Sequence, residues 1–247
     1  MKEETCDWRA RIGVLSPPNP NIICEWNGVL PEGVAFYTAP MDLAETTPEG
    51  LLKMRQSAVA EARKLADWLV DIILFGCTSG SFIGGAGYEE SIIEELETAV
   101  GTASTTTSTC VLTAFADLGV KKIALIGPYL REVFDAEVQF FKAHGIDTLY
   151  VEALGYREVK DFVRLHEQPY LYYRLAKEAC QSAQNIDAIF ITCMASPARK
   201  IINTLERETG RPVISSCSAS LYGVLKQLGI KDPLEEFGRL GRMLGES

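Results

Sequence analysis

The chain carries the stretch DIILFGCTS at residues 71–79, and a second stretch of the same plan, DAIFITCMAS, at residues 187–196. Each stretch begins with aspartate, continues as an apolar run of β-prone residues, and ends in a cysteine that is followed within three residues by serine. Short apolar runs between polar residues are typical of strands that are buried on both faces. Cys77 and Cys193 are therefore expected at matching places, at the carboxyl ends of two buried strands.

Strand-like and helix-like segments alternate around these two runs, and the order restarts near the middle of the chain. The further expected strands are 11–15, 33–38, 122–127, 147–152 and 211–215, and the expected helices are 48–69, 88–100, 111–118, 133–143 and 170–184. Cys193 follows Cys77 by 116 residues, and Gly229 follows Gly119 by 110 residues. Such similar offsets indicate two copies of one unit, each close to an ordinary domain in size.

This alternation predicts an α/β protein with two pseudo-symmetric lobes, each a short parallel sheet flanked by helices. We assign residues 1–104 and 215–247 to the first lobe and residues 105–214 to the second. In parallel sheets, ligands bind beyond the carboxyl ends of the strands. The active site is therefore expected in the cleft between the lobes, with one of the two cysteines on each wall.

Composition excludes several classes of function. The 247-residue chain has a net charge of −9 and no basic block, which argues against nucleic acid as a partner. No apolar run is long enough to span a membrane and the first residues do not resemble a secretory signal, so a cytoplasmic location is expected. Two histidines and the absence of a CxxC motif argue against a metal site. The glycine-rich loop 77–87 lacks the nucleotide-binding signatures, so no cofactor is expected.

The two strand-end cysteines carry the expected chemistry. Glycines and hydroxyl side chains follow Cys77, and free backbone N–H groups there favour an anion, which predicts a thiol pKa below the usual value of about 8.5. Two thiols on opposite walls can take a proton from one face of a carbon and return it to the other. The remaining cysteines are interpreted as small buried hydrophobic residues: Cys6, Cys24, Cys110, Cys180 and Cys217.

The runs GCTSGS at 76–81 and TCMAS at 192–196, with the turn SPPNP at 16–20, resemble the aspartate/glutamate racemase superfamily. Within it, they are most similar to the branch that contains maleate cis-trans isomerase and arylmalonate decarboxylase. The resemblance extends from about Arg11 to Leu244. It implies an enzyme that acts on a small carboxylate without a cofactor, and it makes a homodimer the expected assembly.

Carried over residue by residue, the resemblance implies that Cys77 and Cys193 are the catalytic thiols. Thr78, Ser79 and Tyr129 would hold a substrate carboxylate through hydroxyl and backbone donors. The remaining residues expected to bind substrate are Asn19, Pro17 and Met194.

The sequence leaves three functions open. The leading hypothesis is an isomerase or racemase that uses both thiols, because Cys77 stands where the decarboxylase has glycine. The alternative is an arylmalonate-type decarboxylase with Cys193 as the proton donor. By the resemblance, the Pro17-Pro18 pair is closer to the decarboxylase than to the isomerases. The segment 154–159 lacks the second carboxylate-binding asparagine of maleate isomerases, which leaves open a substrate with a bulkier or neutral second group. The third reading is a small-carboxylate binding protein without turnover.

Overall fold

The computed structural model describes residues 7–18 and 21–246, apart from the side chain of His166. Strands and helices alternate along both halves of the chain. The first half contains β1 (Ala10–Ser16), α1 (Asn21–Trp26), β2 (Val34–Pro40), α2 (Pro48–Asp67), β3 (Ile72–Phe75), α3 (Thr78–Phe82), α4 (Tyr88–Val100), β4 (Ser104–Thr106) and α5 (Thr107–Asp117). The second contains β5 (Lys122–Gly127), α6 (Arg131–Ala143), β6 (Asp147–Ala153), α7 (Val159–Val163), η1 (Leu165–Glu167), α8 (Pro169–Ser182), β7 (Ala188–Ile191), α9 (Arg199–Thr209), β8 (Val213–Ser215), α10 (Ser216–Gln227), η2 (Glu235–Phe237), α11 (Gly238–Met243) and η3 (Leu244–Glu246).

The strands form two four-stranded sheets of the same topology. The first sheet has the order β2-β1-β3-β4 and the second the order β6-β5-β7-β8. Every neighbouring pair is parallel. The second sheet therefore repeats the first strand by strand, which confirms the predicted α/β fold with two pseudo-symmetric halves.

The aspartate that opens each of the two decisive runs has a structural role in the repeat. The Asp71 carboxylate accepts a hydrogen bond of 2.7 Å from the backbone N–H of Arg11, at the start of β1. In the second half, Asp187 accepts bonds of 2.9 and 2.8 Å from the backbone N–H groups of Lys121 and Lys122, at the start of β5. Each aspartate thus fixes the central strand of its sheet at the amino end. All residues of β3 and β7 are buried.

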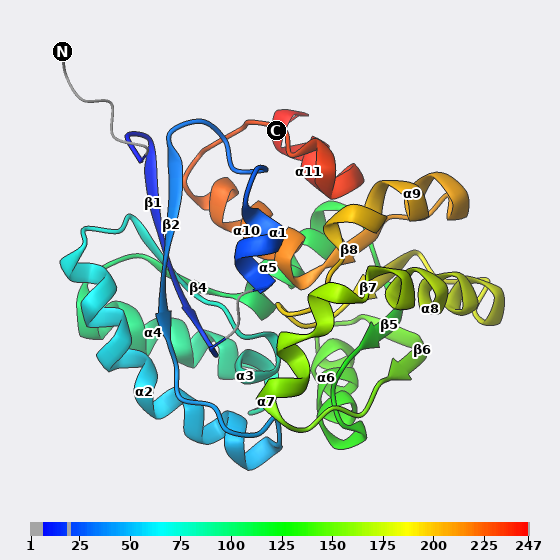
Figure 1. Ribbon diagram of the computed structural model, residues 1–247, viewed down its shortest axis with the longest axis horizontal. Coiled ribbons are helices and arrows are strands. Elements are labelled where there is room, and N and C mark those ends of the chain that lie inside the picture. The colour runs from blue at the N-terminus through cyan, green and yellow to red at the C-terminus, as the bar shows by residue number, and fades with distance from the viewer. Residues whose placement is uncertain (1–6, 19–20, 247) are drawn as a thin grey trace.

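Helices cover the sheets, and several begin at residues that favour a helix start. α2 begins with Pro48 in its first turn, and the Thr47 hydroxyl accepts a hydrogen bond from the N–H of Gly50. Its apolar face packs on β1, β2 and β3, and α4 lies beside it (Figure 1). In the second half, α8 packs on the second sheet and against α9.

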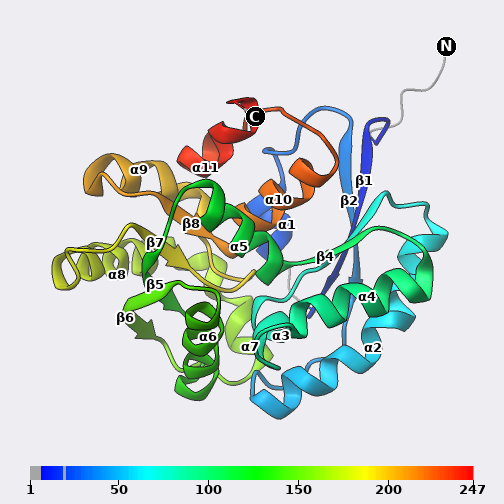
Figure 2. The same cartoon turned by 180° about the vertical axis from the view of Figure 1, so that it is seen from behind.

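α5 and α10 pack against each other between the two sheets, as both views show (Figure 1 and Figure 2). Their backbones approach closely at Gly223, where an added Cβ would lie only 2.6 Å from the sulfur of Cys110. Each of these helices follows the last strand of its sheet directly, so the pair joins the two repeats in the centre of the molecule.

The structure adds elements to those expected. β4 was not predicted, and α5 begins at Thr107 rather than at residue 111. β4 crosses the predicted lobe boundary at 104/105, and the division of the chain into lobes by residue number stays a prediction. In the part of the chain that the structure describes, no helix combines the length and the apolar character that a membrane span requires.

Candidate active site

One pocket lies where the carboxyl ends of the two central strand pairs meet. Ser16 ends β1 and Gly76 and Cys77 follow β3, whereas Tyr129 follows β5 and Cys193 follows β7. All five residues line the pocket, so both sheets contribute the ends of their two middle strands. The pocket holds about 510 Å³ of empty space, its open mouth included, which suits a small molecule.

The pocket brings together seven of the eight site residues that the sequence predicts: Pro17, Cys77, Thr78, Ser79, Tyr129, Cys193 and Met194. The eighth, Asn19, lies outside the described residues. None of the described residues that line the pocket carries a formal charge. Recognition of an anion here therefore depends on hydroxyl and backbone donors.

Cys77 lies at the point where β3 passes into α3. Its backbone is extended, with φ −138°, and the next residue begins the helix. The thiol is 6% exposed, its sulfur lies 3.8 Å from the hydroxyl oxygen of Ser79, and the N–H of Gly80 donates to it. Burial nevertheless raises the pKa of Cys77 to about 11, because the two hydrogen bonds only partly offset the loss of solvent. The expected lowering of this pKa is therefore wrong.

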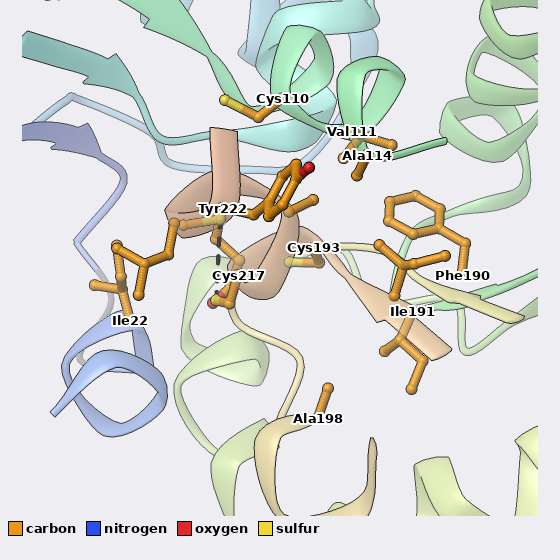
Figure 3. Close-up of a cluster of buried hydrophobic side chains, with 14 of the residues drawn as sticks. Ile22, Cys110, Val111, Ala114, Phe190, Ile191, Cys193, Ala198, Cys217 and Tyr222 are labelled. Carbon is orange, nitrogen blue, oxygen red and sulfur yellow. Dashed lines mark hydrogen bonds between the residues drawn. The ribbon is translucent and has the colours of Figure 1, made fainter. Parts of the chain in front are cut away.

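Cys193 occupies the matching place after β7, with a different backbone. Its φ is +82°, a left-handed conformation that is rare for a residue with a side chain. The N–H of Ala195 donates to its sulfur at 3.4 Å. The pKa of Cys193 is raised to about 12, mainly by burial and to a smaller extent by the Cys77 thiol and the Glu137 carboxyl, against the lowering effect of the bonds from Ala195 and Tyr129. Figure 3 draws this thiol within the buried cluster that also contains Cys217 and Ile191.

Tyr129 connects the two walls. Its hydroxyl forms side-chain hydrogen bonds with Ser79, which belongs to the Cys77 wall, and with Cys193 on the other wall. The ring is 2% exposed and packs against Phe82, Phe134 and Phe162 with centroid distances of 6.4, 5.6 and 6.3 Å. Burial raises the pKa of Tyr129 well above its usual value, so the hydroxyl keeps its proton as a donor.

The first residues of α10 form hydrogen bonds with pocket residues next to both cysteines. The Thr78 hydroxyl donates to the hydroxyl of Ser216 at 2.9 Å, so its own proton is engaged while its oxygen can still accept a bond. The thiol of Cys217 donates to the carbonyl of Met194 at 3.2 Å. Residues from the beginning of α10 therefore fix one neighbour of each candidate thiol.

Sequence reasoning missed most of the apolar lining. The structure adds Ile22, Leu43, Val159 and Phe162, together with Ser16, Thr46, Gly76 and Ala195. Leu43 and Thr46 follow β2, and Val159 and Phe162 follow β6, so the rule that located the cysteines could have located these segments as well.

α1 holds the loop that carries Cys193. The buried Asn21 amide donates to the carbonyls of Ala195 and Phe162, at 2.8 and 3.1 Å. One turn later, Glu25 accepts from the backbone N–H groups of Ala198 and Arg199, at 3.3 and 2.9 Å. No sequence motif indicated either residue, because both contacts are made to backbone groups far along the chain.

Segments from the two halves also meet beside the pocket. The N–H of Thr46 donates to the carbonyl of Arg157 at 2.8 Å, and the Arg157 guanidinium lies 3.0 Å from Glu45. Glu45 and Glu158 form an isolated antiparallel bridge. These contacts join the segment after β2 to the segment after β6 next to the pocket residues Leu43 and Val159.

The fold and the pocket define a class: two-sheet α/β proteins with one cysteine at the end of the third strand of each repeat, facing a common site. The family model described as arylmalonate decarboxylase matches residues 12–241, so the chain belongs to that family. In the described ranges 7–18 and 21–246, no cluster of histidine, cysteine and acidic residues could hold a metal ion.

Curated relatives and solved structures agree with this assignment. The chain is 27% identical to the arylmalonate decarboxylase of Bordetella bronchiseptica over 218 residues, which cover 88% of this chain and 90% of the relative. It is 28% identical to the maleate isomerase of Nocardia farcinica over 214 residues, 84% of each protein. A double mutant of arylmalonate decarboxylase in its liganded form has a TM-score of 0.86 at 25% identity, covering 95% of this chain and 99% of that one.

A mutant of the Nocardia farcinica maleate cis-trans isomerase with a covalently bound succinylcysteine intermediate has a TM-score of 0.87. The identity is 22%, and the alignment covers 95% of this chain and 98% of that one. At this identity the similarity establishes the shared fold. The predicted relationship to the maleate isomerase and arylmalonate decarboxylase branch is confirmed.

Proposed function

We propose that the protein is a cofactor-independent isomerase or racemase of a small carboxylate, with Cys77 and Cys193 as its catalytic thiols. The observation that carries the proposal is that both thiols line one pocket, from matching places in the two repeats. The relatives named as maleate isomerases support the isomerase reading. Paired thiols of this kind suit proton transfer or addition at a carbon next to a carboxylate.

Neutral donors would hold the substrate carboxylate. Ser79 and Tyr129 would donate through their hydroxyls, and Thr78 through its backbone N–H, because its hydroxyl proton is engaged by Ser216. The Tyr129 proton is retained because burial raises the pKa of its hydroxyl. In the proposal, Pro17 and Met194 line the same substrate site, and Asn19 is assigned to it by resemblance. Donors placed in this way would also stabilise the enediolate that forms when charge moves onto the carboxylate.

The racemase reaction would proceed in two proton-transfer steps. One thiolate removes the α-proton: the C–H bond breaks, an S–H bond forms, and the electron pair moves into the carboxylate as an enediolate. The opposite thiol then breaks its S–H bond and delivers that proton to the other face of the carbon. The two sulfur atoms end the cycle with their protonation states exchanged.

The isomerase reaction would use the same groups differently. The Cys77 thiolate adds to one alkene carbon, a C–S bond forms, and the π electrons move into the adjacent carboxylate. Rotation about the resulting single bond precedes cleavage of the C–S bond, which restores the alkene and the thiolate. Cys193 would donate or accept any proton that the intermediate takes up or releases.

Decarboxylation is a second candidate, and two observations favour it. Burial raises the pKa of Cys193 to about 12, which keeps this thiol protonated and ready to donate. The lining of the pocket also includes the apolar side chains of Ile22, Leu43 and Phe162, which suit an aryl or alkyl group. In this reaction a C–C bond breaks to release carbon dioxide, and the Cys193 proton forms the new C–H bond on the remaining enediolate.

Proton NMR in deuterated buffer separates these reactions. The panel contains maleate, α-substituted acids and α,α-disubstituted malonates. Deuterium incorporation at the α-carbon without net conversion indicates racemisation, fumarate from maleate indicates isomerisation, and loss of a carboxyl group indicates decarboxylation. Binding of these acids without any turnover would contradict the proposal and favour a carboxylate-binding protein.

The pH dependence of turnover gives an independent distinction. Because the pKa of Cys77 is raised to about 11, a reaction that needs its thiolate should accelerate about tenfold per pH unit between about pH 6 and 9. A reaction that needs only the Cys193 proton should show no such rise. The expected homodimer stays a prediction, which sedimentation velocity decides.

A further inference from the structure

An acidic residue occupies a core position of α6. The residues that this helix buries are Val133, Phe134, Glu137, Phe140 and Phe141, and four of the five are apolar. The side chain of Glu137 is 0% exposed, in the middle of an aromatic face. A local violation of the apolar pattern of this kind is expected where function requires it.

The Glu137 carboxyl is attached to the wall that carries Cys193. The hydroxyl of Thr192, the residue immediately before Cys193, donates to its Oε1 atom at 2.6 Å. Its Oε2 atom has no hydrogen-bond partner among the described residues. Thr192 is itself fixed, because its N–H donates to the Ile126 carbonyl at 2.9 Å and its carbonyl accepts from the Ser196 hydroxyl at 2.7 Å.

Burial raises the pKa of Glu137 to about 8, against the lowering effect of the Thr192 bond. Its charge acts on two titratable groups of the site: it raises the pKa of Cys193 and the pKa of Tyr129. The thiol belongs to the loop after β7, and the phenol to the loop after β5.

Among the described residues, the nearest other buried ionic group on α6 is at its C-terminal end, where His144 Nε2 lies 3.2 Å from Glu89 Oε1. α3, which packs against α6, carries no ionisable residue, and the acidic residues of β6, Asp147 and Glu152, are exposed and half-buried. The charged side chains of α6 itself lie on its exposed face: Arg131, Glu132, Asp135 and Lys142.

We propose that Glu137 is a positioning residue that controls the charge state of Cys193: it is held as a neutral carboxylic acid while the site works, and its ionisation at alkaline pH suppresses the Cys193 thiolate. As a neutral group, Glu137 accepts the hydrogen bond from Thr192 without repelling a negatively charged Cys193 sulfur. Once Glu137 is ionised, its carboxylate lies beside the turn of Thr192 and Cys193 and disfavours a second negative charge on the Cys193 sulfur. The catalytic importance of this control rests on the proposed function, whereas the control itself is a property of the protein without substrate.

Alkylation of Cys193 by iodoacetamide tests the proposal without any turnover. The rate at the Cys193 peptide is followed by mass spectrometry from about pH 7 to 9.5, in the wild type and in Glu137→Gln. Since the thiolate is the reactive form, the logarithm of the rate should rise with a slope of one while Glu137 is neutral. In the wild type the slope should fall below one above about pH 8, whereas in Glu137→Gln it should stay at one.

The two proteins should therefore react equally at about pH 7, and the variant should react roughly three to ten times faster at about pH 9.5. Glu206→Gln is the matched control, because Glu206 is a buried acid on α9 that binds the backbone N–H of Val213 instead. It should follow the wild type. Cys110, buried between α5 and α10, serves as the internal reference for opening of the fold.

Parallel pH profiles of Cys193 alkylation in the wild type and Glu137→Gln would overturn the proposal. It would also be overturned if the variant accelerated alkylation of Cys110 as much as that of Cys193. The wild-type profile is decisive even if the variant does not fold: a slope of one up to about pH 9.5 contradicts the proposal. Thr192→Val gives a further check, since loss of the donor should move the break to higher pH. Failure of all substrates in the NMR panel would refute the proposed function and leave this result unaffected.

Discussion

Replacement of Asn21 by leucine should destabilise the protein substantially, because this side chain ties three parts of the pocket together. The Asn21 amide is fully buried and donates to the carbonyls of Phe162 and Ala195 at 3.1 and 2.8 Å. Leucine has a similar volume, so the main loss is two hydrogen bonds to backbone groups. Each of the two buried carbonyls left without its partner costs about 1–3 kcal/mol, which predicts a total loss of roughly 2–6 kcal/mol.

Equilibrium urea unfolding, followed by circular dichroism, measures this loss as a change in the free energy of unfolding. Asn203→Leu is the matched control, because the hydrogen bonds of the Asn203 amide are exposed: it donates to the Glu235 carbonyl at 2.9 Å and accepts from Arg242 at 3.5 Å. The control should change stability by less than about 0.5 kcal/mol. Equal effects of the two substitutions would contradict this prediction, since the burial of the hydrogen bonds would then not matter.

Three further predictions concern pH, strain and packing. Burial raises the pKa of Glu25 from 4.5 to about 7, so the folded state binds this proton more tightly than the unfolded chain and the associated stability falls as pH rises from about 4.5 through 7. Urea unfolding should therefore show the wild type losing about 3 kcal/mol more than Glu25→Gln between about pH 4.5 and 8, and equal slopes would contradict this. Cys193→Gly should melt at a higher temperature than Cys193→Ala, because glycine tolerates the φ of +82° better by about 1 kcal/mol. Gly223→Ala should cost about 1–3 kcal/mol by forcing α10 away from Cys110, and an unchanged melting temperature would disprove that close contact.

The sequence predicted the elements in which local pattern and tertiary burial agree. Seven of the eight strands lie in runs that the sequence predicts, including β3 and β7, whose residues are all buried. β4 escaped prediction because its sequence, STT, gives no apolar signal, although all three of its residues are buried. Its burial depends on pairing with β3 and on the cover of α5, which are long-range features.

The candidate site was predicted in position and only partly in chemistry. The duplicated strand ends located Cys77 and Cys193, which both line the pocket. The predicted lowering of the Cys77 pKa is wrong, because a sequence pattern indicates local hydrogen-bond donors but not the depth of burial, which raises the pKa. Glu137 carried a usable signal, since an acid stands in the apolar stripe of its helix, whereas the contacts of Asn21 depend on residues more than 140 positions away.

Turnover by single cysteine variants is the decisive test of catalysis by the two thiols. Once the NMR panel identifies the substrate, kcat is measured for Cys77→Ala, Cys193→Ala and the control Cys180→Ala, whose thiol is half-buried on α8 and outside the pocket. Each pocket variant should lose at least about 10²-fold in kcat, whereas the control should keep wild-type activity. Full turnover by both Cys77→Ala and Cys193→Ala would show that the two thiols are not catalytic.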